Sequence, residues 1–176
     1  MALRDFTADR AEVLPGDGPN RRLLRHAPDA WITLKYLVVE DAEGPKFSGR
    51  GNDYRVRIRN GYLFALGDAY VVQPESVGDQ VNVSTDIVFP DGMAWASDLE
   101  HQQFGRRMTF GDLRESVLIA GDIRIVDAGG GARLAIRGTI DSRNDAGWQE
   151  SFQRISRAQR DYWSAEDEPF LVTIVT

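Results

Sequence analysis

The longest regular pattern in the chain is helical and lies close to its C-terminus. Five residues recur every three or four positions and so share one helix face, four of them apolar or aromatic and one, Gln159, polar: Trp148, Phe152, Ile155, Gln159 and Tyr162. An acidic turn follows, and the apolar run at 170–175 then predicts a strand. We expect this strand to lead toward a further domain, with the chain a fragment of a larger protein.

Most of the remaining chain has the pattern of short β-strands. Residues 31–38 alternate, with Ile32, Leu34, Tyr36 and Val38 on one face and Thr33 and Lys35 on the other. Asn60-Gly61 predicts a hairpin between strands at 54–59 and 62–66. Gly129-Gly130-Gly131 predicts another, between strands at 119–126 and 133–140.

Other segments carry weaker patterns. Residues 1–30 predict a solvated loop around a short strand, 81–89 a strand, and 93–110 a long loop or edge segment. Thr109, with Asp112 three residues later, predicts a capping box that starts a short helix.

These patterns predict a mainly β fold. We expect an antiparallel sandwich or a curved, saddle-like sheet, with one short helix and one C-terminal α-helix. The predicted organisation is a β-rich domain at 1–147, a connecting helix at 148–163, and a turn and strand at 164–176 that lead toward a downstream domain.

Composition excludes several classes of function. A chain of 176 residues is long enough for a buried core, and its net charge of −6 argues against a nucleic-acid partner. The absence of cysteine excludes disulfides, thiolate nucleophiles and cysteine zinc sites. No run is long and apolar enough for a membrane span, and no signal peptide is evident. We therefore expect a soluble protein with no membrane partner. For a bacterial-type protein, these features leave both the cytoplasm and the periplasm open.

The ionisable residues form no recognisable catalytic pattern. His26 and His101 are the only histidines, and Asp98 and Glu100 could pair with His101 on a loop. Solvated neighbours are the more ordinary interpretation, since no second histidine has zinc-ligand spacing and the H-E-x-x-H pattern is absent. No serine lies in a G-x-S-x-G elbow.

Two further groups of residues have both a structural and a functional interpretation. The arginines of 54–59 alternate with apolar residues and could bind an anion, although a solvent-facing side of an edge strand is favoured. Aromatic residues could form a ligand-binding wall, although a core or interface is favoured: Trp95, Trp148, Tyr162 and Trp163. Gly49-Arg50-Gly51 is interpreted as a turn. We assign no catalytic, cofactor-binding or metal-ligating residue.

Several phrases of the sequence resemble one enzyme family. They are residues 3–6, 62–74, 81–95, 112–122 and 135–138, then R-A-Q-R-D-Y-W at 157–163 and P-F-L-V-T at 169–173. Together they resemble the region that precedes the zinc site in glycyl aminopeptidases, which are thermolysin-like metallopeptidases, or gluzincins. The last pair is the most specific.

The resemblance implies an accessory role. In this family a β-rich N-terminal domain packs against a catalytic domain that carries the H-E-x-x-H helix. No such motif occurs in this chain, so no metal ligand or catalytic base is carried over. The chain is expected to shape one side of a substrate cleft, to need no cofactor and to show no activity alone. Zinc is expected only in the downstream catalytic domain, which would be its partner.

Two other functions remain open. One is a stand-alone small β-barrel that binds or cyclises an apolar molecule, lined by Tyr54, Trp95 or Trp163. The other is an interaction domain that forms a homo-oligomer through an exposed face of the helix. If the helix lacks a partner, part of its aromatic surface should be exposed: Trp148, Phe152, Tyr162 and Trp163.

Overall fold

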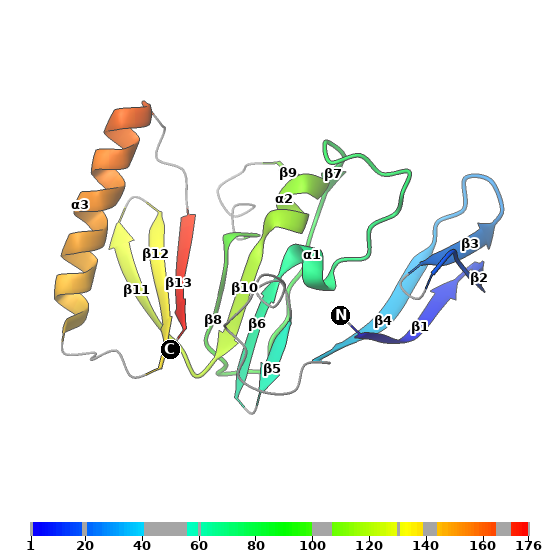
Figure 1. The fold of residues 1–176 in the computed structure, drawn as a ribbon, viewed down its shortest axis with the longest axis horizontal. Coiled ribbons are helices and arrows are strands. Elements are labelled where there is room, and N and C mark those ends of the chain that lie inside the picture. Colours follow the sequence, from blue (N-terminus) through cyan, green and yellow to red (C-terminus); the bar gives the residue numbers. More distant parts are fainter. Residues whose placement is uncertain are drawn as a thin grey trace. The chain divides into compact units, whose positions relative to one another are not determined.

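A computed structural model shows a mainly β chain that divides into two compact units, Met1–Pro45 and Lys46–Thr176. The structure describes residues 2–18, 21–40, 56–59, 61–99, 107–129, 131–138, 144–164 and 170–175. All but one of the strand pairs between these residues are antiparallel, and the longest helix is near the C-terminus (Figure 1). The predicted fold class is confirmed. The strands form separate open sheets of two, three or four strands, and the described residues contain no closed barrel.

The N-terminal unit consists of two strand pairs. Strand β1 (Ala2–Asp9) pairs with β4 (Thr33–Val39), and β2 (Ala11–Pro15) pairs with β3 (Arg22–His26). The predicted loop over 1–30 is therefore wrong. The strand pattern is hidden because the β1 register shifts between Arg4 and Thr7, which disrupts the alternation of side chains.

The predicted alternation in β4 is confirmed. Leu34, Tyr36 and Val38 are half-buried, and Tyr36 stacks on Phe6 of β1 with ring centroids 6.1 Å apart. Lys35 and the other residues of the opposite face up to residue 37 are exposed. In the ranges 4–18 and 21–40 no residue is fully buried, so this unit has an apolar face and no closed core.

The C-terminal unit begins with a four-stranded sheet in the order β5-β6-β10-β8. Its strands are β5 (Arg57–Arg59), β6 (Tyr62–Leu66), β8 (Trp95–Ser97) and β10 (Val117–Gly121). Arg59 pairs with Tyr62 across Gly61, which has a φ of 74° and supports the predicted hairpin. Strand β8 lies at the sheet edge, within the segment for which a loop or edge was predicted.

Short elements connect these strands. Helix α1 (Gly67–Tyr70) follows β6, and β7 (Asn82–Val83) pairs with β9 (Met108–Thr109). The predicted strand at 81–89 is thus only two residues long, since only Asn82 and Val83 pair with β9. Helix α2 (Phe110–Glu115) starts at Thr109 with the predicted capping box.

A three-stranded sheet completes the unit. It contains β11 (Arg124–Gly129), β12 (Ala132–Arg137) and β13 (Phe170–Val175) in that order. The predicted strand at 119–126 is in fact interrupted at Gly121, where a φ of 106° turns the chain from one sheet to the other. Strands β11 and β12 form the predicted hairpin, with Gly129 and Gly131 at positive φ.

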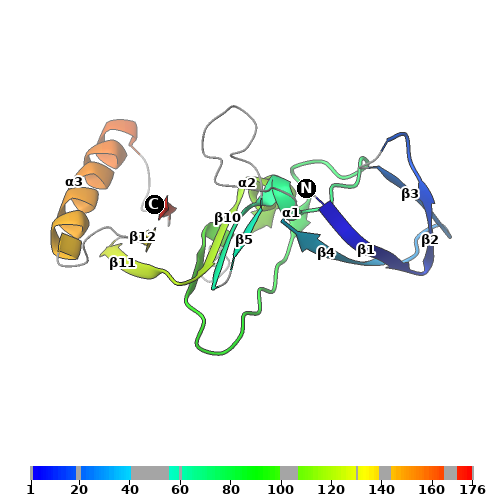
Figure 2. The ribbon, with the colours of Figure 1, turned by 60° about the horizontal axis from the view of Figure 1, so that its bottom comes forward.

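Helix α3 (Asp145–Trp163) connects β12 to β13, and these two strands are parallel. Figures 1 and 2 both show α3 beside β11 and β12. The last predicted strand therefore exists, and all six of its residues are in register with β12 of the same chain. A downstream domain remains a prediction.

The four-stranded and three-stranded sheets of the C-terminal unit share a core. Tyr62, Ala96, Ile119 and Ala135 are buried together, with ends of β13 packed against them through Leu171 and Val175. On the other side of β12, Leu134 and Ile136 are 2% and 1% exposed. Strand β12 is therefore buried on both faces between Leu134 and Ile136.

Candidate functional site

The histidine and carboxylate pair considered from the sequence is only partly within the described residues. His26 is exposed at the end of β3, and its Nδ1 lies 2.8 Å from the carbonyl oxygen of Ala27. His101 and Glu100 lie outside the described residues. Asp98 accepts a 2.8 Å hydrogen bond from the backbone N–H of Val117, so its carboxylate holds the start of β10.

Metal-ligand clusters were also sought in the structure. Across the ranges that the structure describes, no three side chains of the histidine, aspartate and glutamate types gather as a metal site would require. The glycine cluster at 49–51 and Arg55 lie outside these ranges.

The arginines of β5 do not all face solvent, which corrects the favoured interpretation of this strand. Arg57 is 8% exposed, whereas Ile58 is 43% exposed. The hairpin register explains the reversal, because Arg57 pairs with Phe64 and Arg59 with Tyr62. Directly opposed residues in an antiparallel pair share a face, and that face packs into the core through Tyr62 and Phe64.

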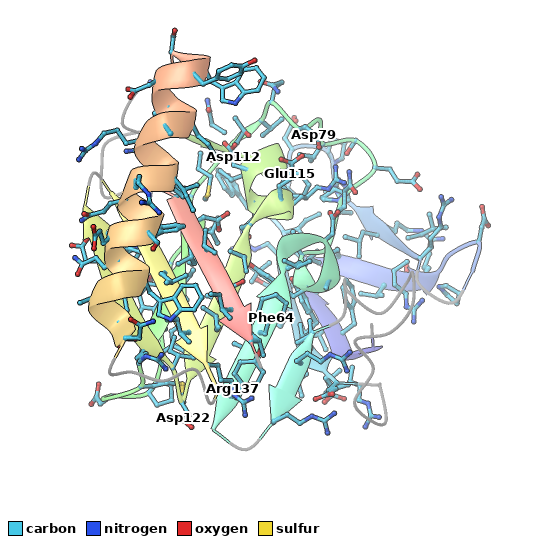
Figure 3. All side chains as sticks on the ribbon, turned by 60° about the vertical axis from the view of Figure 1, so that its left-hand side comes forward. Phe64, Asp79, Asp112, Glu115, Asp122 and Arg137 are labelled. Carbon is cyan, nitrogen blue, oxygen red and sulfur yellow. The ribbon has the colours of Figure 1, made fainter. Side chains whose placement is uncertain are left out.

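Tyr62 meets Arg137 from β12, and Arg57 and its strand partner Phe64 lie on the same face of the hairpin as Tyr62. We call these four residues the Tyr62 cluster. The guanidinium carbon of Arg137 lies 4.1 Å from the centre of the Tyr62 ring, a cation–π contact between the two sheets. Figure 3 shows Phe64 and Arg137 near the same end of β13. The alternating arginines of the sequence were the one signal that could have pointed to this cluster.

The chemistry of the Tyr62 cluster follows from its burial. Removal from water raises the pKa of the Tyr62 phenol to about 12, although the positive charges of Arg137 and then Arg57 oppose the rise. The phenol therefore keeps its proton at neutral pH and can act as a hydrogen-bond donor but not as a base. The contact between Arg137 and Tyr62 joins the three-stranded sheet to the four-stranded sheet.

A second arginine on the same side of β12 makes another inter-sheet contact. Arg133 donates a 2.9 Å hydrogen bond to the carbonyl oxygen of Ser97. The fully buried Ser97 hydroxyl in turn donates to the carbonyl oxygen of Val117 at 2.7 Å. Both arginines of β12 thus hold structure between the sheets.

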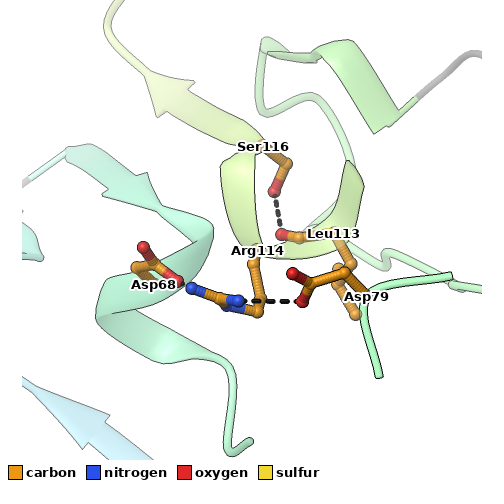
Figure 4. A network of polar contacts seen from close by, with 5 residues as sticks. All are labelled: Asp68, Asp79, Leu113, Arg114 and Ser116. Atoms are coloured by element: carbon orange, nitrogen blue, oxygen red, sulfur yellow. Dashed lines mark hydrogen bonds and ion pairs between the residues drawn. The ribbon is translucent and has the colours of Figure 1, made fainter. Parts of the chain in front are cut away.

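A third arginine joins the helical segments (Figure 4). Arg114 on α2 contacts Asp68 of α1 and Asp79, each at 2.9 Å. Its hydrogen bonds to Asp68 and then Asp79 raise the pKa of Arg114. The partners lie 46 and 35 residues away in sequence, so no local pattern could have predicted them.

The aromatic residues considered as a ligand-binding wall belong to different elements. Trp95 lies on β8 and packs on Phe89, with ring centroids 5.4 Å apart. Tyr162 and Trp163 form an edge-to-face pair at the end of α3, with centroids 4.9 Å apart. Tyr54 lies outside the described residues.

Helix α3 contacts its sheet mainly through polar residues. Gln149 donates a 2.6 Å hydrogen bond to the carbonyl oxygen of Asp127, and Ser156 is buried. Phe152 is the aromatic exception and packs on Phe170 with centroids 5.5 Å apart. These residues recur at helical spacing, but the face they define is not the predicted apolar face.

The predicted apolar face is largely exposed. Trp148 is 37% exposed, Ile155 53% and Tyr162 77%, and the adjacent Trp163 is 74% exposed. The prediction of exposed aromatic surface on this helix is confirmed for all of the named residues except the half-buried Phe152.

No known protein family model matches the chain, and no curated protein is similar enough to count as a relative. Among the helices within the described ranges, none combines the length and apolar character that a transmembrane span requires.

Proposed function

We propose that this chain is a non-catalytic, β-rich accessory domain of a metallo-aminopeptidase-like protein. In this role it packs on a catalytic domain of the same polypeptide and shapes one side of the substrate cleft. The resemblance to glycyl aminopeptidases supplies the class of parent enzyme. Zinc would belong to the catalytic domain.

One observation carries the proposal, namely the half-covered apolar face of β1 and β4. Phe6, Leu34, Tyr36 and Val38 share this face, and none of them is fully buried. Isolated two-stranded ribbons are marginally stable in water because one strand pair buries too little apolar area. A further domain packed on this face would stabilise the unit, as expected for an accessory domain.

The first experiment tests the class of the parent protein. The reading frame downstream of Thr176 is expected to encode H-E-x-x-H, and the longer protein is expected to bind zinc and hydrolyse aminopeptidase substrates. Residues 1–176 alone are expected to do neither. Stoichiometric zinc with chelator-sensitive hydrolysis by this chain alone would contradict the proposal, as would a downstream frame without the motif.

The second experiment tests the face. L34D places a charge on the half-buried side of β4, whereas L37D places it on the opposite side, where Leu37 is already 55% exposed. In the longer protein we expect L34D to reduce kcat/KM about tenfold or more and L37D to change it by less than about twofold, since a buried, unpaired charge is costly. Equal effects of the two variants would exclude this face as the contact.

A further inference from the structure

The exposed side of α3 has a strict seven-residue repeat. Trp148, Ile155 and Tyr162 are separated by seven residues each, and Ser151 and Ala158 lie between them at the complementary spacing. Large residues thus occupy one set of heptad positions and small residues the other. Large side chains at this spacing line one seam of a helix, along which a second helix can pack.

The seam formed by these five residues is separate from the two other sides of α3. The sheet-facing side carries Gln149, Phe152 and Ser156. Gln149 bonds to the carbonyl oxygen of Asp127 in β11, Phe152 packs on Phe170 of β13, and Ser156 is buried. The remaining side carries charged, exposed residues, with Glu150 and Arg157 away from the seam and Arg154 and Asp161 at its border. Apart from the half-buried Ser151, the seam residues are therefore exposed while α3 stays on its sheet.

We propose that the seam binds a second copy of this chain, with the two α3 helices antiparallel about a two-fold axis. In an isologous contact the same patch must complement itself, and the alternation of sizes does so. When Ile155 lies opposite Ala158 of the second copy, Tyr162 lies opposite Ser151 of the second copy. Ile155 and Tyr162 then each face a small side chain, which is how facing helix layers interdigitate.

Charge selects the same register. In an antiparallel pair, the residues that precede the large heptad positions flank the seam on one side. In this chain they are Arg154 and Asp161, which have opposite charges. The register that places Ile155 opposite Ala158 brings Arg154 of each copy beside Asp161 of the other. A register with Ile155 opposite Ile155 would instead bring the two Arg154 side chains together.

The charges of α3 argue against a membrane surface as the partner of the seam. Helix α3 carries three acidic residues, Asp145, Glu150 and Asp161, and three arginines, at 154, 157 and 160. Helices that lie on anionic bilayers have an excess of basic residues on the polar side, which is absent here. This inference does not rest on the proposed function, because it concerns a different surface from the face of β1 and β4.

Sedimentation equilibrium of residues 1–176 tests the proposal. We expect a dimer with a dissociation constant of roughly 1–100 µM, because a seam of about four helical turns is at the small end of specific interfaces. I155D should weaken the dimer at least about a hundredfold, since it places a charge at the centre of the seam. Circular dichroism of each variant verifies that α3 is intact.

Charge reversal tests the register. R154E and D161R should each weaken the dimer about tenfold through two symmetric like-charge contacts, and the double variant should return to within about threefold of the original. R157E is the matched control, with the same charge change on the side of α3 away from the seam, and should have less than about threefold effect.

Three results would overturn the proposal. The first is a monomer at about 100 µM, and the second is equal weakening by R154E and R157E. The third is a longer protein that remains monomeric and loses stability on I155D, which would show that a downstream segment covers the seam. None of these results bears on zinc binding or hydrolysis, so failure here is distinguishable from failure of the proposed function.

Discussion

Gly121 lies where the chain leaves the four-stranded sheet for the three-stranded one. Its φ is 106°, and a Cβ at this position would collide with the carbonyl oxygen of Gly61 in the β5–β6 hairpin. That carbonyl already accepts a 2.7 Å hydrogen bond from the N–H of Asp122. The close approach of the two turns therefore requires glycine for both space and backbone conformation.

We expect G121A to lower the free energy of unfolding by about 3 kcal/mol or more, as measured by urea denaturation. G92A is the matched control, because Gly92 also has a positive φ of 79° but has nothing within 4 Å of the added Cβ. It should cost about 1 kcal/mol. Equal losses would mean that backbone conformation alone, and not the contact with Gly61, constrains position 121.

The raised pKa of Tyr62 predicts that the free energy of unfolding falls at alkaline pH. Its pKa is raised by burial to about 12 in the folded chain, against about 10 when unfolded. The unfolded chain therefore loses this proton first as pH rises. Ionisation of Tyr62 leaves the free energy of unfolding unchanged below about pH 10 and lowers it progressively as pH rises toward 12. At about pH 11.5 the phenol should lower the unfolding free energy by about 2 kcal/mol relative to pH 9.

Urea denaturation of the original chain and of Y62F at both pH values measures this loss, since phenylalanine cannot ionise. The decrease should be smaller by about 2 kcal/mol in Y62F. An identical decrease in the two proteins would assign the alkaline instability to other groups.

At the scale of single elements, the capping box of α2 was predictable because all of its contacts are local. The Thr109 hydroxyl accepts a 3.2 Å hydrogen bond from the N–H of Asp112, whose carboxylate accepts a 2.8 Å bond from the N–H of Thr109. T109A should lower the unfolding free energy by about 1 kcal/mol, and T109S should retain most of it. Urea midpoints of the two variants measure the difference, and an equal loss in both would point to the methyl group rather than the hydroxyl.

Helix α3 shows where local pattern stops being informative. Its periodicity predicted a helix at 148–163, and the structure has one at Asp145–Trp163. The side that meets the sheet could not be predicted, because Gln149 and Ser156 lie on it while Ile155 and Tyr162 are exposed. Hydrophobicity identifies an apolar side, but the partner that covers this side is not encoded in the spacing.

The solvent-facing position favoured for Arg57 was wrong for a related reason. Alternation along β5 indicated two faces, and charge suggested which one meets water. The decisive fact is that β5 opposes Tyr62 and Phe64 of β6, and that Arg137 of β12 lies over the Tyr62 ring. This packing links residues about 80 positions apart, and no candidate site could be assembled from the sequence without it.

At the scale of the whole molecule, the two units differ in their cores. Ile119, Ala120 and Ala135 of the C-terminal unit are 0% exposed, whereas 4–18 and 21–40 contain no buried residue. We expect amides of β1 to β4 to exchange hydrogen at least about tenfold faster than those of β10 and β12, because local opening there exposes little apolar surface. Exchange followed by mass spectrometry measures this, and equal protection in both units would contradict it.

Because β12 pairs with β13, the three-stranded sheet can be completed only late in translation. Strand β12 gains its hairpin neighbour β11 almost as soon as it is made, since only a short turn separates them. Its other neighbour, Phe170–Val175, is translated only after the whole of α3. Until Phe170–Val175 emerge from the ribosome, β12 is an unpaired edge strand that carries the apolar residues Leu134 and Ile136. During that interval the nascent chain can aggregate or bind a chaperone through this edge.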